Sequence, residues 1–221
     1  MFIQLQNNQP ANGTRKTPLL PDRYYHIYNR GINGQNIFVE QKNYSFFLKK
    51  YAQFVSPFTD TYAYCLLKNH FHFLIKTISE EDTMKIVMPS FQAKASQKSV
   101  SWHLSNSFAS LFKSYAQAFN KRYSRTGGLF EEPFHRIEVD DDAYFSKLLW
   151  YIHFNPQKHG FVKDFREYDH SSYRSHLLER KTKLNRAEVL SWFGNKNNYI
   201  DFHLKRYPID KIMNKFVIEF D

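Results

Sequence analysis

The alternation of apolar and polar positions along the chain predicts four extended segments. The four segments are residues 23–28, 59–67, 70–77 and 129–139. The second and third segments are separated only by Lys68 and Asn69, so we expect them to form an antiparallel hairpin. The fourth is interrupted by Pro133, which cannot donate a backbone hydrogen bond to a sheet.

Apolar residues recur at helical spacing in three further segments, which are residues 41–55, 101–123 and 140–154. Pro57 ends the first pattern, Gly127 ends the second, and Pro156 follows the third. The third segment begins with three aspartates, whose carboxylates can cap the positive end of a helix. We therefore expect three main helices.

This order of strands and helices predicts an α+β fold, with an open, ferredoxin-like antiparallel sheet and helices packed on one face. In such an arrangement the first strand lies beside the strand that starts at His70, which would bring His26 near the candidate site on that strand. The polar residues 1–21 are expected to form a flexible N-terminal arm. Residues 22–175 would form the main domain, and the charged residues 176–221 a small helical appendage.

The composition narrows the class of molecule that the protein is expected to bind. The 221-residue chain carries a formal net charge of +10 and has an aromatic content of 18%, which favours a polyanion such as nucleic acid and offers stacking surface for unpaired bases. The single cysteine, Cys65, excludes an internal disulfide. Neither a membrane-spanning apolar run nor a signal-peptide pattern is seen, so we expect a cytoplasmic protein without membrane contact.

The stretch His70-Phe71-His72 is the strongest candidate for chemistry. Successive side chains on a strand point to opposite faces, so both imidazoles would stand on one face and could hold one metal ion. The alternative is a packed or hydrogen-bonded histidine pair without a metal.

A second candidate is Tyr151-Ile152-His153-Phe154-Asn155-Pro156. A tyrosine and an amide four residues apart lie on one face of a helix. Tyr151 also belongs to an apolar stripe and could simply be a core residue, and Asn155 before a proline could simply end the helix.

Together these groups could cleave DNA. Two imidazoles and the Asn155 amide form a mixed nitrogen and oxygen site that suits Mg²⁺ or Mn²⁺. Such an ion polarises a phosphodiester, and the Tyr151 phenol would attack the phosphorus to form a covalent phosphotyrosine. This requires that the phenol and both imidazoles converge on one cavity open to solvent.

These motifs resemble those of the single-tyrosine HUH transposases, and more closely the REP-associated tyrosine transposase branch. His70-Phe71-His72 is similar to the HUH metal motif, and 151–156 is similar to the "YI-x-x-NP" signature of the branch. The resemblance extends over about 24–173. Lys68 stands where relatives commonly have Pro, and Asn155 stands where insertion-sequence relatives usually have Gln.

The resemblance implies the HUH endonuclease fold, with His70, His72 and Asn155 as metal ligands and Tyr151 as the catalytic nucleophile. It implies an enzyme that cleaves and transfers single-stranded DNA beside a hairpin through a 5′-phosphotyrosine, with Mg²⁺ or Mn²⁺ as cofactor. Both monomeric and homodimeric relatives exist, and no feature of the chain decides between a monomer and a homodimer.

Contacts to DNA outside the catalytic groups are expected from basic and aromatic residues, which can hold phosphates and stack on bases. The candidates are Arg30, Lys121, Arg122, Tyr123, Arg125 and Arg136. Two alternatives remain for the function: a hairpin-binding protein without catalysis, and an HUH nickase of the replication-initiator or relaxase type. The third histidine of relaxases, and the second tyrosine or attached helicase of replication initiators, are not evident in the chain.

Overall fold

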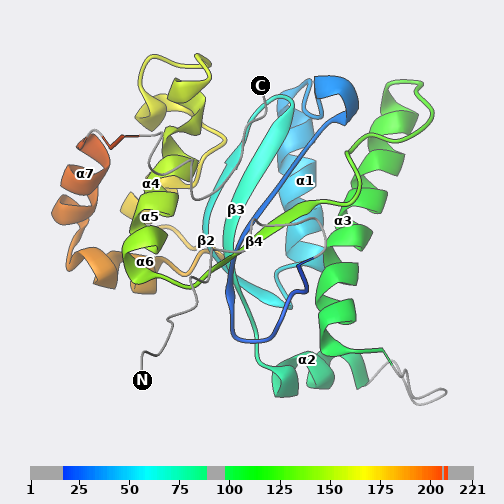
Figure 1. Cartoon of the computed structure of the whole chain (residues 1–221). Helices are drawn as coiled ribbons and strands as arrows, with labels where there is room; N and C mark the ends of the chain where they lie inside the picture. Colours follow the sequence, from blue (N-terminus) through cyan, green and yellow to red (C-terminus); the bar gives the residue numbers. More distant parts are fainter. Residues whose placement is uncertain (1–16, 89–97, 206, 209–221) are drawn as a thin grey trace, which may run out of the picture.

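The computed structural model describes residues 17–88, 98–205 and 207–208. Most of the expected N-terminal arm, residues 1–16, lies outside the described residues. Figure 1 shows a central sheet with helices on both sides. No helix in the described part of the chain is long and apolar enough to cross a membrane.

The sheet has four strands in the order β2-β3-β1-β4, and every neighbouring pair is antiparallel. The strands are β1 (Tyr24–Arg30), β2 (Thr59–Leu66), β3 (His70–Thr77) and β4 (His135–Val139). The expected hairpin forms between β2 and β3, where the backbone N–H of Leu67 donates to the carbonyl of His70 at 2.8 Å. As expected, β1 lies beside the histidine strand, with Tyr28 paired to His72.

The helices are α1 (Gln41–Phe54), α2 (Glu80–Val87), α3 (Val100–Arg122), α4 (Asp142–Lys158), α5 (Tyr173–Leu177), α6 (Arg186–Phe193) and α7 (Lys196–Leu204), with 3-10 turns η1 (Ile32–Gly34) and η3 (Phe165–Glu167). Helix α1 begins with a capping box between Glu40 and Asn43, and α3 begins with Ser99, whose side chain accepts from Trp102 N–H. The α+β class and the antiparallel sheet are confirmed.

The helices differ from the expected arrangement, because they cover both faces of the sheet. Helices α1 and α3 pack on one face, against Ile27, Phe71 and Phe73. Helix α4 packs on the other face, against Ala63 and Leu74 together with other residues of that core. The reason is that the strands are apolar on both faces, so each face needs its own covering layer.

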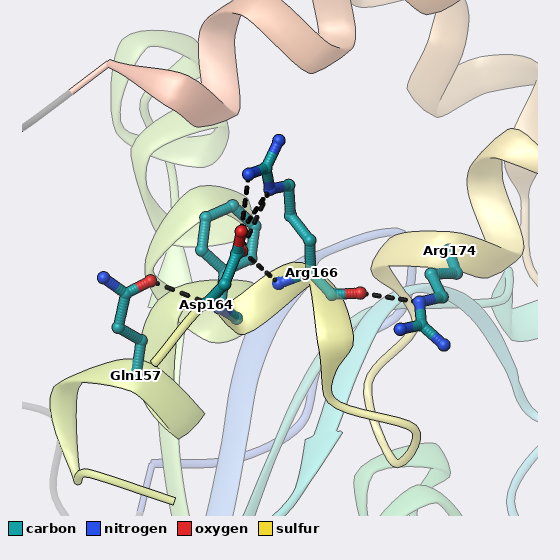
Figure 2. Close-up of polar contacts among 5 residues, drawn as sticks. Gln157, Asp164, Arg166 and Arg174 are labelled. Carbon is teal, nitrogen blue, oxygen red and sulfur yellow. Dashed lines mark hydrogen bonds and ion pairs between the residues drawn. The ribbon is translucent and has the colours of Figure 1, made fainter. Parts of the chain in front are cut away.

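Helix α4 is also longer than expected, because Pro156 lies inside its last turn and the helix continues to Lys158. Proline lacks a backbone N–H, so one helical hydrogen bond is missing at Pro156. Polar contacts with residues outside α4 support the end of the helix. The side-chain oxygen of Gln157 accepts from the backbone N–H of Phe165 at 3.2 Å, and Arg174 donates to the Arg166 carbonyl (Figure 2). These contacts fix the end of α4 to η3 and α5.

The segment 176–205 packs against the hydrophobic core between α4 and the sheet. Val189 and Tyr199 are fully buried within that core. The Trp150 indole N–H of α4 donates to the His203 carbonyl at 3.2 Å, and Tyr62 of β2 donates to Glu188 at 2.8 Å. Helix α7 therefore lies on the outer side of α4 (Figure 1), whereas α6 contacts strand β2 directly.

Candidate active site

Strand β3 places His70 and His72 on the sheet face that α4 covers. The two rings lie with centroids 5.2 Å apart and planes at 87°. Their side chains are buried, with 3% and 1% of the residue surface exposed. The expected side-by-side arrangement on one face follows from the pleat of the strand.

Each histidine of the pair has its Nδ1 atom held by a neighbouring side chain. The Oδ1 of Asn69 lies 2.8 Å from His70 Nδ1, and the Nε2 of His26 lies 3.0 Å from His72 Nδ1. An amide oxygen can only accept, so His70 carries its proton on Nδ1 when the ring is neutral. Such a bond at one ring nitrogen orients the other nitrogen of a metal-ligating histidine.

The buried histidines are neutral at physiological pH. Burial lowers the pKa of His26 and of His70 to about 3, and it holds the pKa of His72 well below its usual range. Neighbouring histidines lower these pKa values further. Neutral imidazole is the form that binds a metal ion.

Helix α4 brings Tyr151 and Asn155 to the same place. The Tyr151 ring lies edge-on to the His72 ring, with centroids 5.9 Å apart. Asn155, one helical turn later, donates from Nδ2 to the Tyr151 carbonyl at 2.9 Å. Its Oδ1 atom is buried and has no hydrogen-bond partner among the described residues, so this oxygen suits a further ligand.

The expected opening to solvent is absent at Tyr151. Only 1% of the residue is exposed, and burial raises the pKa of its phenol above the usual range. The Lys158 ammonium lies over the ring, 5.5 Å from its centroid. Tyr151 therefore lies close to His72, as expected, but its phenol is covered by protein.

The side chains of His70, His72 and Asn155 can be compared with the needs of a divalent metal ion. The neutral His70 and His72 rings, held at Nδ1, and the buried Oδ1 of Asn155 have the donor chemistry of a mixed nitrogen and oxygen site. No cluster of three or more His, Cys, Asp or Glu side chains suited to a metal occurs in the described ranges. The residues thus fit a divalent ion that takes its other ligands from phosphate or water.

Three neighbours of the site were not singled out from the sequence. His159 lies 5.0 Å from His70 between ring centroids, and Tyr28 stacks on His135 at 4.7 Å while lying 5.9 Å from His72. His159 follows Asn155 by four residues, a helical spacing that could have indicated it. His135 could have been found only from the register of β4 against β1.

Four of the candidate DNA contacts lie together at the end of α3, whereas Arg30 and Arg136 lie on strands β1 and β4. Several of them are engaged by the protein. The Arg30 Nε atom bonds to Glu131 at 2.6 Å, and Arg122 bonds to Glu40 at 3.2 Å. The Tyr123 hydroxyl also donates to Glu40. These contacts are compatible with a role in DNA binding only if phosphate competes with the carboxylates.

The remaining three candidates have different surroundings. Arg125 donates to Gln35 at 2.6 Å, and Lys121 is exposed in the last turn of α3. Arg136 is buried on the α3 face of the sheet, where its Nη1 donates to Ser105 at 2.8 Å. It therefore faces away from the histidine pair.

Ser171 and Ser172, near the end of the region that resembles the transposases, have a structural role. Residues 170–172 pair with the edge of β2, through Leu66 N–H to the His170 carbonyl and Ser172 N–H to the Tyr64 carbonyl, both at 2.9 Å. The Ser172 hydroxyl oxygen lies 2.7 Å from His153 Nε2 on α4. This segment thus ties the helix that carries Tyr151 to the sheet.

Comparison with known proteins supports the same resemblance. No protein-family model matches the chain. A curated protein of Haemophilus influenzae, named as a REP-associated tyrosine transposase, is 27% identical over 143 residues, which are 63% of this chain and 69% of that protein. The chain resembles the REP-associated tyrosine transposases. The matched length is most of both proteins.

A solved structure has the same fold. The REP-associated tyrosine transposase described as bound to a REP hairpin superposes with a TM-score of 0.52 at 14% identity, over 74% of this chain and 84% of that chain. The α+β fold with an antiparallel sheet is therefore shared with that transposase.

Proposed function

We propose that the protein is a metal-dependent endonuclease and strand transferase of the HUH type, acting on single-stranded DNA near hairpins. The observation that carries the proposal is the placement of the Tyr151 ring 5.9 Å from that of His72, on the sheet face that also holds His70. The fold is shared with a transposase whose structure contains a REP hairpin. The net charge of +10 suits a DNA partner.

In this proposal Tyr151 is the nucleophile. Its oxygen would attack a backbone phosphorus and form a phosphotyrosine at the new 5′ end, while the bond from phosphorus to the 3′ oxygen breaks. The proton lost by the phenol would pass, directly or through water, to that oxygen, which leaves as a 3′ hydroxyl. Attack by a 3′ hydroxyl on the phosphotyrosine would reverse the step and free the phenol, so strands can be rejoined without another energy source. No atoms are lost in this exchange, because one phosphodiester replaces another.

His70, His72 and Asn155 would hold a divalent ion such as Mg²⁺ or Mn²⁺. When bound, the ion would polarise the phosphodiester and offset the charge that builds on its oxygens. Asn69 and His26 would orient the two imidazoles. His159, exposed beside His70, would meet the incoming strand.

The burial of Tyr151 requires a movement before DNA can reach the phenol. The Lys158 ammonium lies over the ring from the exposed end of α4, so displacement of this long side chain by a phosphate would be part of that movement. An ammonium that shifts from the ring to a phosphate keeps an electrostatic partner throughout.

A second function is favoured by the same burial. A hairpin-binding protein without catalysis would need no access to Tyr151, whose phenol is 1% exposed and has a raised pKa. In that case Tyr151 and the histidine pair are core residues, and binding of structured single strands is the whole activity.

One experiment separates the two functions. The protein is incubated with a labelled hairpin oligonucleotide carrying single-stranded flanks, with Mn²⁺ or with a chelator, and resolved under denaturing conditions. HUH activity predicts a covalent protein–DNA adduct that needs Mn²⁺ and is lost in Tyr151→Phe and His70→Ala. Tight binding with no adduct under any divalent ion would establish the binding function instead. An adduct that persists in Tyr151→Phe would show that another residue is the nucleophile.

A further inference from the structure

Helix α4 is buried on all of its sides around the catalytic tyrosine. Every residue from 148 to 153 is buried, and such a run is longer than one helical turn of about 3.6 residues, so it covers the whole circumference. The hydrophobic effect has no direction. A helix of this kind would bury a similar apolar area after a rotation about its axis, so apolar packing alone does not select the side that faces the histidine pair.

His153 is a polar residue in the middle of this buried run. It follows Tyr151 by two positions and precedes Asn155 by two, so it lies on the opposite side of α4 from both. On that side its Nε2 lies 2.7 Å from the Ser172 hydroxyl oxygen, and its Nδ1 lies 2.9 Å from His203 Nε2 on α7. Helix α7 runs beside α4 on its outer side (Figure 1).

The last acceptor fixes the direction of each hydrogen bond through His153. The Tyr199 carbonyl can only accept, and it lies 2.8 Å from His203 Nδ1, so that nitrogen carries the proton. Burial lowers the pKa of both histidines, so both rings are neutral. His203 Nε2 therefore accepts from His153 Nδ1, and His153 Nε2 accepts from the Ser172 hydroxyl. The Ser172 oxygen accepts in turn from the backbone N–H of Tyr64 at 2.9 Å.

A rotation of α4 would break these hydrogen bonds. Ser172 and His153 are fully buried, and His203 is 1% exposed, so water cannot replace a lost partner. The Trp150 indole N–H, which donates to the His203 carbonyl, would lose its acceptor as well. A buried polar group without a partner is costly, and hydrogen bonds act over a narrow range of distances and angles. They therefore specify the rotation that apolar packing leaves open.

We propose that His153 is a positioning residue of the active site, which sets the rotation of α4 by bonding to Ser172 and His203 and so directs Tyr151 and Asn155 toward the histidine pair. The proposal rests on the proposed function for the reaction in which Tyr151 takes part. It gives helix α7 a role in that reaction, exerted from the far side of α4.

Three substitutions of His153 test the proposal. His153→Leu removes both bonds, His153→Asn keeps a donor near the Nδ1 position, and His153→Gln keeps an acceptor near the Nε2 position. The rate of adduct formation is measured in a single turnover at saturating hairpin DNA and Mn²⁺, and hairpin affinity is measured with a chelator. Urea unfolding identifies conditions in which each variant is fully folded.

A misdirected nucleophile slows the reaction without weakening binding. We expect His153→Leu to reduce the rate at saturation about 10- to 100-fold, the usual effect of a small misplacement of a reacting group. Hairpin affinity should stay near the native value. His153→Asn and His153→Gln should each recover part of the rate. If His153→Leu does not fold, Ser172→Ala and His153→Asn, which each remove one bond, replace it and should each slow the reaction.

Val189→Ala is the matched control for a loss of stability. Val189 is fully buried on α6 in the same core, so its truncation leaves a cavity but keeps the bonds of His153. Its rate per folded molecule should equal the native rate. Ser172→Ala should slow the native protein but add little in His153→Leu, because the bond is already lost there. A native rate in fully folded His153→Leu, or an equal loss in Val189→Ala, would overturn the proposal.

A second measurement needs no cleavage. A 3-fluorotyrosine at position 151 reports the surroundings of that ring by ¹⁹F NMR, and His153→Leu should shift its resonance. The same label at Tyr25, which is buried on the opposite face of the sheet, should keep its resonance. A shift at 151 without any adduct in the native protein would refute the endonuclease and retain the role of His153 in setting α4. An adduct in the native protein, with neither its rate nor the resonance changed in His153→Leu, would refute the positioning role alone.

Discussion

His26 and His72 lie on neighbouring antiparallel strands and share a hydrogen bond of 3.0 Å between Nε2 and Nδ1, although 46 positions separate them in the chain. Both residues are buried, at 0% and 1% exposure. A buried bond of this kind fixes the direction of the His72 ring, and with it the direction of its other nitrogen, Nε2.

Substitution of His26 is therefore expected to weaken metal binding without removing a ligand. His26→Ala should reduce Mn²⁺ affinity about 10- to 100-fold, the usual effect of losing a residue that orients a metal-bound histidine. Titration calorimetry with Mn²⁺ would measure it. His26→Gln, which can still bond to His72 Nδ1, should recover part of the affinity, and His135→Ala should leave it near the native value. Equal affinity in His26→Ala and the native protein would contradict this role.

Tyr151→Phe should separate chemistry from folding. The change removes one buried hydroxyl and keeps the ring against His72, so the free energy of unfolding should change by no more than about 1 kcal/mol. Covalent adduct formation should disappear, while hairpin binding is retained. Tyr144→Phe, two turns earlier on the same helix and also buried, is the matched control and should keep the adduct. A denaturing gel and a thermal melt measure the two effects.

Acid is expected to destabilise the layer formed by α4, α5 and α7. His153, His176 and His203 are buried close together, beside Tyr173 and Tyr199. Burial lowers the pKa of His203 to about 3 and that of His176 to about 4, and holds the pKa of His153 well below its usual range.

The unfolded chain therefore takes up protons near pH 6.5 while the folded protein does not. Stability should be complete above about pH 6.5 and fall as the pH decreases, by up to about 1.4 kcal/mol per pH unit for each histidine. The melting temperature measured from pH 7.5 to pH 4 would show this decline. A melting temperature that stays constant over this range would contradict it.

The C-terminal helices should prove necessary for stability. Tyr199 on α7 is fully buried, and truncation of a large buried aromatic residue to alanine costs about 3–5 kcal/mol. Leu204→Ala, on the same helix at 52% exposure, should change stability by less than about 0.5 kcal/mol. Urea unfolding of both variants measures the difference, and equal midpoints would indicate that 196–204 is a separable appendage.

The elements that could be predicted are those specified by local pattern. The turn at Lys68–Asn69, the pair of histidines on one strand face, and the helix that carries Tyr151 and Asn155 follow from periods of two and 3.6 residues. The predicted end of α4, at about residue 154, is wrong. Pro156 is tolerated in the last turn of the helix, where the Gln157 side chain accepts a hydrogen bond from the backbone N–H of Phe165.

In the candidate site, too, some features follow from local pattern and others from tertiary packing. His70, His72, Tyr151 and Asn155 were singled out from the chain and do lie together. The covering of Tyr151 by Lys158, the stacking of His135 on Tyr28, and the hydrogen bond of Arg136 to Ser105 depend on packing between distant segments. No local spacing encodes these contacts.

The sequence by itself determined which chemical groups the protein has and which local element carries each, because strand and helix periodicity act over a few residues. Tertiary structure alone decided that α4 covers the face opposite α1 and α3, that Tyr151 is buried beside His72, and that Arg136 faces away from the histidine pair. These outcomes come from the pairing of β1 with β3 and β4, strands far apart in the chain. Their register assigns each side chain to one face of the sheet or the other.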